Sequence, residues 1–215
     1  MREKRTDLVM ILDRSGSMSG LERDTIGGYN SMLRAQKKLP GEVLVTTVLF
    51  DHTYTLLHDR KDISSVSPLS PRDYQIGGTT ALYDAIGITL HHIENKYREK
   101  GKNNGHVIVV ITTDGMENAS REYSAFAIKS MIDRLKETCG FEFIFLGANM
   151  DAAEVAKDFG IARDRAVTYH PDEKGTRMNY KSINYAVENL RCSNVIPDDW
   201  KAEIEEDFKN RKKRK

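Results

Sequence analysis

Short apolar runs alternate along the chain with longer stretches in which apolar residues recur at helical spacing. The runs are apolar at consecutive positions, which is typical of strands buried on both faces of a largely parallel sheet. We predict such strands at residues 8–12, 43–50, 106–112, 141–146 and 166–169. The helical patterns lie at residues 20–38, 81–99, 121–138, 151–159 and 176–190. This alternation predicts an α/β fold, a doubly wound and mostly parallel sheet with helices on both faces.

One predicted strand departs from this alternation. The run TYTLLH at residues 53–58 follows the strand at 43–50 after only Asp51 and His52. A link this short cannot make a parallel crossover, so we expect a hairpin that gives the sheet one antiparallel edge strand.

The end of the chain differs in composition from the rest. A last helix is predicted after Pro197, and the chain closes on RKKRK at residues 211–215. We interpret this basic end as a solvated tail, and the alternative is a targeting or phosphate-contacting element.

Length and charge limit the class of protein. The 215 residues suffice for one sizeable core, and 33 basic against 32 acidic side chains leave a net charge of +1. Since no strong overall field results, we expect no nucleic-acid or membrane partner. The longest apolar runs are of strand length, far below the ~20 residues of a membrane span. Cys139 and Cys192 give no disulfide framework and no signal segment is legible, so we expect a cytoplasmic protein. Because no apolar run is long enough for a membrane span, we expect it to be soluble, and we also expect a monomer.

Oxygen-bearing side chains follow the ends of predicted strands. Asp13, Ser15 and Ser17 come just after the first strand, and Asp114 follows the strand at 106–112. The loop GGTT at residues 77–80 adds further hydroxyls where a helix begins. Open α/β sheets place their ligands at the carboxyl ends of the strands, so these groups should converge. Hard oxygen donors without His or Cys suit Mg²⁺, Mn²⁺ or Ca²⁺.

Three ordered motifs carry a family resemblance. The chain resembles the von Willebrand factor type A (VWA) domain in three motifs: DRSGSM after a strand, then GGTTALYDAI, then ITTDG. The metal-ion-dependent adhesion site (MIDAS) of that domain has the pattern DxSxS…T…D. The resemblance covers roughly residues 5–190. The run FIFLGANMDAAEVAKDFGI also resembles stand-alone cytosolic bacterial and phage members of the family. We therefore divide the chain into a VWA domain at 1–195 and a C-terminal helix with a basic tail at 196–215.

The resemblance implies a metal site with five residues: Asp13, Ser15, Ser17, Thr80 and Asp114. The two serines would bind the ion directly, Thr80 would join in the ligand-bound state, and the aspartates would act largely through water. Thr80 is preferred to Thr79 because it directly precedes ALYDA. The implied ion is Mg²⁺ or Mn²⁺, with Ca²⁺ as a further candidate. With neither carboxylate on the ion, the metal stays electrophilic, so the implied partner is a protein presenting Glu or Asp.

Known enzyme motifs are incomplete in this sequence. A phosphatase with an aspartyl nucleophile needs a second acid two residues after Asp13, where Ser15 stands. GxSxG, GxxxxGK[ST] and a GxGxxG that follows a strand are missing as well. We therefore predict a metal-dependent protein–protein interaction module and not an enzyme. The alternative is a metal-dependent hydrolase acting on phosphate esters.

Structural roles are expected for the other polar candidates near the same edge. Thr79 and Asp84 should cap or support a helix, and Asn149 and Asp151 should serve a turn and a helix cap.

Two residue pairs within helical patterns are also interpreted as structural. Gly27 and Gly28 each cost a helix ~1 kcal/mol relative to Ala, so we expect them where the helix packs closely on the sheet. The pair His91–His92 lacks the HExxH spacing of a zinc protease and is expected to be solvated or to pack on a neighbour.

Overall fold

The structure, a computed structural model, describes residues 5–99 and 105–212. This part of the chain contains six strands: β1 (Thr6–Asp13), β2 (Val43–Phe50), β3 (Tyr54–Asp62), β4 (His106–Thr113), β5 (Glu142–Ala148) and β6 (Ala166–Tyr169). They form a sheet in the order β3-β2-β1-β4-β5-β6, in which all neighbours are parallel except β2 and β3. The predicted antiparallel edge strand is therefore confirmed as β3.

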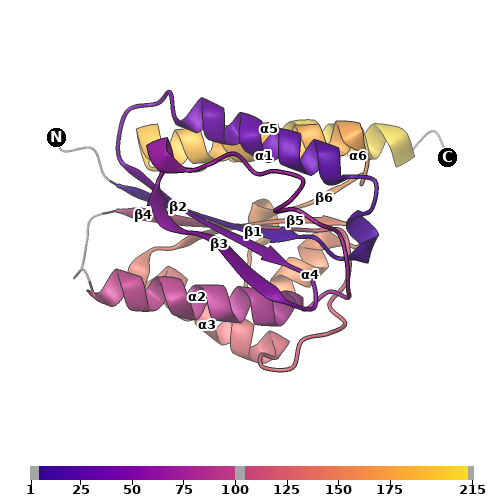
Figure 1. Ribbon diagram of the computed structural model, residues 1–215, viewed down its shortest axis with the longest axis horizontal. Helices are drawn as coiled ribbons and strands as arrows, with labels where there is room; N and C mark the ends of the chain where they lie inside the picture. The colour runs from indigo at the N-terminus through magenta and orange to yellow at the C-terminus, as the bar shows by residue number, and fades with distance from the viewer. Residues whose placement is uncertain (1–4, 100–104, 213–215) are drawn as a thin grey trace.

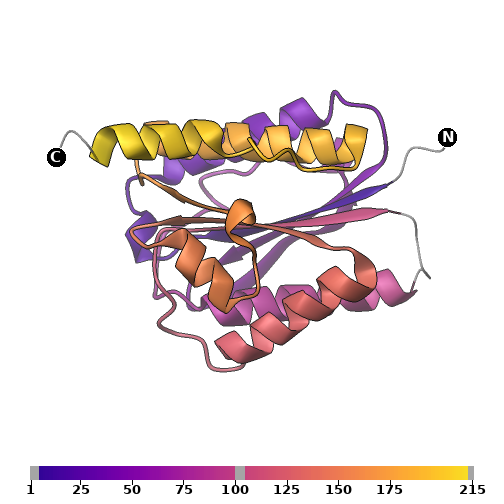
Figure 2. The same cartoon turned by 180° about the vertical axis from the view of Figure 1, so that it is seen from behind.

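Six helices of the described residues flank the sheet: α1 (Glu22–Gln36), α2 (Leu82–Glu99), α3 (Ala125–Cys139), α4 (Ala152–Asp158), α5 (Glu173–Ser193) and α6 (Ala202–Lys212). Figure 1 shows α1, α5 and α6 over one face and α2, α3 and α4 over the other, and Figure 2 shows the same layers from behind. The predicted α/β class with helices on both faces is confirmed.

All five predicted helices begin within a few residues of the predicted position, and the largest differences, at α3 and α5, have a cause in side chains that bond the backbone there. Helix α3 begins at Ala125 and not at residue 121, because the N–H groups of residues 121–123 bond the Asp84 carboxylate at 2.8–2.9 Å. Ser124 then caps the helix by accepting from the Ala127 N–H at 3.2 Å. Helix α5 begins earlier than predicted, at Glu173, because Asp172 accepts from the Gly175 N–H at 2.8 Å.

The two faces of each central strand contribute to different cores. In β1, Leu8, Met10 and Leu12 pack with α1 and α5, whereas Val9 and Ile11 pack with α2 and α3. All five side chains are fully buried. Consecutive apolar residues therefore predict this strand correctly, since alternate side chains point to opposite faces and both faces are covered.

The prediction that the glycine pair of α1 packs on the sheet is wrong, because Gly28 packs on a helix and Gly27 packs on neither. A Cβ on Gly28 would lie 2.2 Å from the ring of Tyr180 in α5, so Gly28 permits the close approach of α1 and α5. No atom lies within 4 Å of the corresponding position on Gly27, and nothing in the structure explains a glycine there.

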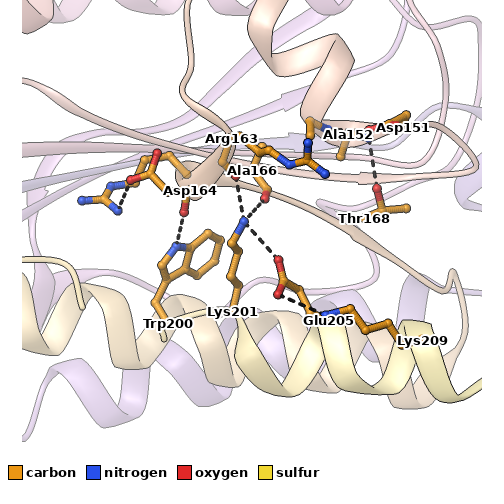
Figure 3. Close-up of polar contacts among 12 residues, drawn as sticks. Asp151, Ala152, Arg163, Asp164, Ala166, Thr168, Trp200, Lys201, Glu205 and Lys209 are labelled. Carbon is orange, nitrogen blue, oxygen red and sulfur yellow. Dashed lines mark hydrogen bonds and ion pairs between the residues drawn. The ribbon is translucent and has the colours of Figure 1, made fainter. Parts of the chain in front are cut away.

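Helix α6 lies along the outer edge of β6. Trp200, in the turn before α6, is buried and donates from Nε1 to the Asp164 carbonyl at 2.8 Å. Lys201 donates from Nζ to the carbonyls of Arg163 and Ala166 at 2.7 and 2.8 Å (Figure 3). The bond from Lys201 thus occupies the Ala166 carbonyl, a backbone group that the edge strand β6 would otherwise offer to another chain.

The first residues of the basic chain end belong to a helix. Arg211 belongs to α6, where it forms ion pairs with Asp172 and, at 2.9 Å, with Asp207. The expectation of a solvated tail is therefore wrong for Arg211, because two carboxylates lie within its reach; residues 213–215 of RKKRK are outside the described residues. No helix in residues 5–99 and 105–212 combines the length and the apolar character that a membrane crossing requires.

Candidate metal centre

The adjacent positions of β1 and β4 bring the two predicted site carboxylates together. Asp13 is the last residue of β1, and Asp114 follows the last residue of β4. Since the two strands are parallel neighbours, both side chains lie at the same end of the sheet. Ser17, in the loop after β1, donates from Oγ to Asp114 Oδ1 at 2.5 Å and so joins the two loops.

The three predicted hydroxyl groups surround one point beside Gly115. A Cβ added to Gly115 would lie 3.0 Å from Ser17 Oγ, 3.1 Å from Thr80 Oγ1 and 3.8 Å from Ser15 Oγ. The two serine Oγ atoms are 3.1 Å apart. The structure thus brings all five predicted site residues to one end of the sheet, and their binding of a metal stays a prediction.

Asp13 organises the loop that carries the two serines. Its Oδ1 accepts from the Ser15 N–H at 2.7 Å, a local turn that aspartate favours, and the chain then enters a 3₁₀ turn over Gly16–Met18. Its Oδ2 accepts from Thr113 Oγ1 at 2.5 Å, and its backbone carbonyl accepts from the buried Tyr74 hydroxyl. Both oxygens of this carboxylate are therefore held by the protein itself.

The loop before α2 is tied to the loop that follows β4. The Thr80 N–H donates to Asn118 Oδ1 at 2.9 Å, and the Asn118 N–H donates to the Thr80 carbonyl at 3.0 Å. Glu117 accepts from the N–H groups of Tyr83 and Ser120 at 2.9 and 2.7 Å. These bonds hold the loop that carries Thr80 and the loop that carries Asp114 against each other.

Sequence reasoning missed Tyr74, Thr113, Glu117 and Asn118, all of which support this site. Thr113 stands directly before Asp114 in the motif TTDG, and its place next to a site residue was a usable signal. The bonds of Tyr74 and Asn118 reach 61 and 38 residues along the chain, and no local pattern predicts them.

Asp84, Asn149 and Asp151 have the structural roles expected of them, whereas Thr79 is exposed and its expected role stays a prediction. Asp84 accepts from three backbone N–H groups of the loop before α3. Asn149 has a left-handed backbone with φ 57° and donates from Nδ2 to the Asp114 carbonyl at 3.2 Å. Asp151 caps α4 by accepting from the Ala153 N–H at 3.1 Å, and His92 pairs with Asp59 at 2.7 Å.

Asp13 and Asp114 are buried carboxylates without a basic partner. Their exposed fractions are 0% and 2%, and within residues 5–99 and 105–212 neither forms an ion pair with a Lys, Arg or His side chain. The nearby Arg14 instead reaches Thr53 and Thr55 on the β2–β3 hairpin, with its Nε 3.5 Å from Asp51. Buried charges in proteins are normally paired or bound to a metal, so the site fits a cation.

The pKa values of Asp13 and Asp114 agree with a cation site. Burial raises the pKa of Asp13 to about 6 despite the hydrogen bonds from Thr113 and Ser15, and the charge of Asp114 adds to the rise. Burial also raises the pKa of Asp114. Carboxylate and hydroxyl oxygens are donors for Mg²⁺, Mn²⁺ or Ca²⁺. The described residues contain no group of three or more His, Cys, Asp and Glu side chains placed to hold a metal, so neutral hydroxyls have to complete any shell here.

Without metal, Asp13 is expected to make the protein more stable in mild acid. Its pKa is raised from 3.8 to about 6 in the folded state, so the folded protein binds a proton where the unfolded chain does not. This stabilisation is complete below the unfolded pKa and is lost as the pH rises through the folded one, a change of about 3 kcal/mol. Urea unfolding in chelator measures the free energy of unfolding of wild type and of Asp13→Asn at each pH. The variant should be more stable than wild type at pH 7, and this difference should become smaller as the pH falls to about 4. A stability difference between the two proteins that stays the same at every pH would contradict a raised pKa of Asp13 in the folded protein.

Comparison with solved structures identifies the fold. The mussel byssus proximal thread matrix protein 1, in a form with a zinc-occupied MIDAS motif, matches with a TM-score of 0.58 and 14% identity over 86% of this chain and 48% of its own. The ArnB paralog VWA2 from Sulfolobus acidocaldarius matches with a TM-score of 0.54 and 19% identity over 86% and 45%. Manganese-loaded TRAP from Plasmodium vivax matches with a TM-score of 0.57 and 17% identity over 83% and 73%. At these identities the likeness concerns the fold, and the chain spans about half the length of the mussel and archaeal proteins.

Sequence comparison gives the family. No curated protein matches the sequence. The profile of the family described as "VWA domain containing CoxE-like protein" matches residues 1–173, most of the chain and all the residues of the candidate metal centre. The chain therefore belongs to the family of VWA domain containing CoxE-like proteins.

Proposed function

We propose that the carboxyl end of the sheet binds a divalent cation and, through it, an acidic side chain of a protein partner. The residues proposed for the cation are Asp13, Ser15, Ser17, Thr80 and Asp114. The observation that carries the proposal is the pair of buried carboxylates that have no basic partner in residues 5–99 and 105–212, next to three converging hydroxyls. Together these groups offer two negative charges and several neutral oxygens, which suits one divalent ion.

The ion we propose is Mg²⁺ or Mn²⁺, with Ca²⁺ as a further candidate. Two of the solved relatives support a divalent metal in this fold, one with zinc at its MIDAS motif and one loaded with manganese. Hydroxyl and carboxylate donors without His or Cys favour the harder ions over zinc in this chain.

The bonds of the two carboxylates support binding and not catalysis. Asp13 already accepts from Ser15 and Thr113, and Asp114 already accepts from Ser17, so neither is a free base directed at solvent. A cation at the hydroxyls would supply an electrophilic centre with room for an outside carboxylate. We therefore propose that the protein is no enzyme; turnover of a generic phosphodiester by wild type, lost in Asp13→Ala, would instead support the alternative of a phosphate-ester hydrolase.

The location that we propose is the cytoplasm. Cys139 and Cys192 are both free thiols, as a reducing compartment keeps them.

The decisive experiment compares Thr80→Ala with Thr79→Ala. A partner is captured with wild type in Mg²⁺, and its affinity for each variant is then measured by calorimetry. Thr80→Ala should weaken partner binding by about five- to a hundredfold, the scale of a 1–3 kcal/mol coupling. The exposed Thr79 is a matched control, and its loss should change little. Replacing the partner's key Glu by Gln should cost a similar factor, whereas binding unchanged in chelator would contradict the proposal.

A further inference from the structure

The loops around the candidate metal centre are formed mainly of small residues. Gly16 and Ser17 are exposed after β1, and Gly78 and Thr79 are exposed before α2. A Cβ on Gly77 would meet no atom within 4 Å. On these two sides the loops that surround the site, here called the rim, expose glycines and short polar side chains, and the exposed His52 lies against Gly78.

Met116 stands out from this rim as a large apolar side chain in water. It lies in the third loop around the site, after β4, and is 65% exposed. The other large apolar residues exposed in the described chain lie in β3, in α3, in α5 and just after α5: Leu56, Phe126, Tyr185 and Val195. Its Cα follows that of Gly115 at the ~3.8 Å of a trans peptide. Since Gly115 lies beside the three hydroxyls, the backbone of Met116 lies next to the candidate metal centre.

The position of Met116 is set by its neighbours in the loop. Glu117 and Asn118 turn inward, where they bond the N–H groups of Tyr83 and Thr80. Glu117 further accepts from the N–H groups of Ala119 and Ser120 at 2.8 and 2.7 Å. With this part of the loop braced, the exposure of Met116 is a feature of the fold and is available for contact without rearrangement.

We infer that Met116 is a specificity-determining contact, and that the partner presents an acidic residue with an aliphatic or aromatic residue beside it. This inference rests on the proposed function, since the carboxylate fixes the partner at the metal centre and places the neighbouring side chain against Met116. A methionine suits this role because its flexible, polarisable side chain adapts to differently shaped apolar groups. Two buried carboxylates balance a divalent ion, so an incoming anion meets no excess negative charge at the centre.

The test uses the whole chain and a phage-displayed library of random peptides. Phage are bound in Mn²⁺ and eluted with chelator, and the selected peptides are synthesised and titrated by fluorescence anisotropy. We expect Asp or Glu in the selected peptides, with Leu, Ile, Met or Phe within two positions. Met116→Ser should weaken their binding by about tenfold, and Met116→Leu should restore it, because the contact is apolar burial.

Val195→Ser is the matched control. Val195 is similarly exposed but follows Asn194, which bonds His106 at the first residue of β4, so it lies at the opposite end of the sheet. This variant should bind the peptides as wild type does, and the Mn²⁺-induced rise in melting temperature should be unchanged in Met116→Ser. Acidic peptides without an apolar neighbour, or equal binding by Met116→Ser and Val195→Ser, would overturn the inference alone. A selection without acidic residues would overturn the proposed function and this inference with it.

Discussion

Addition of Mn²⁺ to the metal-free protein is expected to raise its melting temperature, and Asp13→Ala is expected to lose most of this rise. An ion that binds only the folded state, at ~100 times its dissociation constant, stabilises by ~2.7 kcal/mol. For a chain of this length that corresponds to roughly 5–10 °C. The physical reason is that the ion compensates the buried charges of Asp13 and Asp114, which have no basic partner in the described residues. Differential scanning fluorimetry with and without chelator measures the shift.

Asp151→Ala serves as the control for this experiment. Asp151 follows β5, near the same end of the sheet, but its carboxylate caps α4 and lies outside the candidate site. This variant is expected to lose some basal stability with its helix cap, about 1 kcal/mol, and to keep the full ion-induced shift. An equal shift in Asp13→Ala and wild type would refute the metal assignment.

Gly115→Ala is expected to weaken metal binding strongly while the protein stays folded. The added methyl group would lie 3.0 Å from Ser17 Oγ and 3.1 Å from Thr80 Oγ1, so both hydroxyls would have to move from their present positions. Misplacing the groups that orient ligands commonly costs about 10- to 100-fold in metal affinity. Titration of Mn²⁺ by calorimetry gives the dissociation constant for wild type and variant.

Gly77→Ala is the control that shows whether the effect belongs to position 115 or would follow the loss of any glycine in these loops. Gly77 belongs to another loop of the same rim, and a Cβ there would meet nothing within 4 Å. Neither glycine has a positive φ, so alanine is compatible with the backbone at both positions. We expect Gly77→Ala to bind Mn²⁺ like wild type; an equally harmless Gly115→Ala would mean that the three hydroxyls do not form the metal site.

Local sequence patterns were sufficient for the elements and for one part of the site. Consecutive apolar residues predicted the buried strands, because a strand covered on both faces needs no polar side. The short link after β2, two residues as predicted and three in the structure, indicated the antiparallel edge, because no parallel crossover fits into it. Asp13, Ser15 and Ser17 lie within five residues of one another, and one short loop brings their oxygens together in any fold that forms it.

Helix boundaries and the packing of the glycine pair were less predictable. Helix α3 starts late because Asp84, in another helix, binds the N–H groups of residues 121–123. Gly28 meets Tyr180, whose position depends on how α5 packs beside α1. In both cases the deciding contact comes from a residue far away in the sequence.

By itself the sequence therefore determined the α/β class, the antiparallel edge and the loop from Asp13 to Ser17, because these depend on spacing along a few residues. Only the tertiary structure decided that β4 lies beside β1, which brings Asp114 to within 2.5 Å of Ser17 across 97 residues of chain. It also decided that Arg14 lies against Asp51, so that the two site carboxylates have no basic partner in the part of the chain that the structure describes. The physical reason is that a crossover helix can place the next strand on either side of a parallel sheet, and the hydrogen bonds and charges of the site exist only once that order is set.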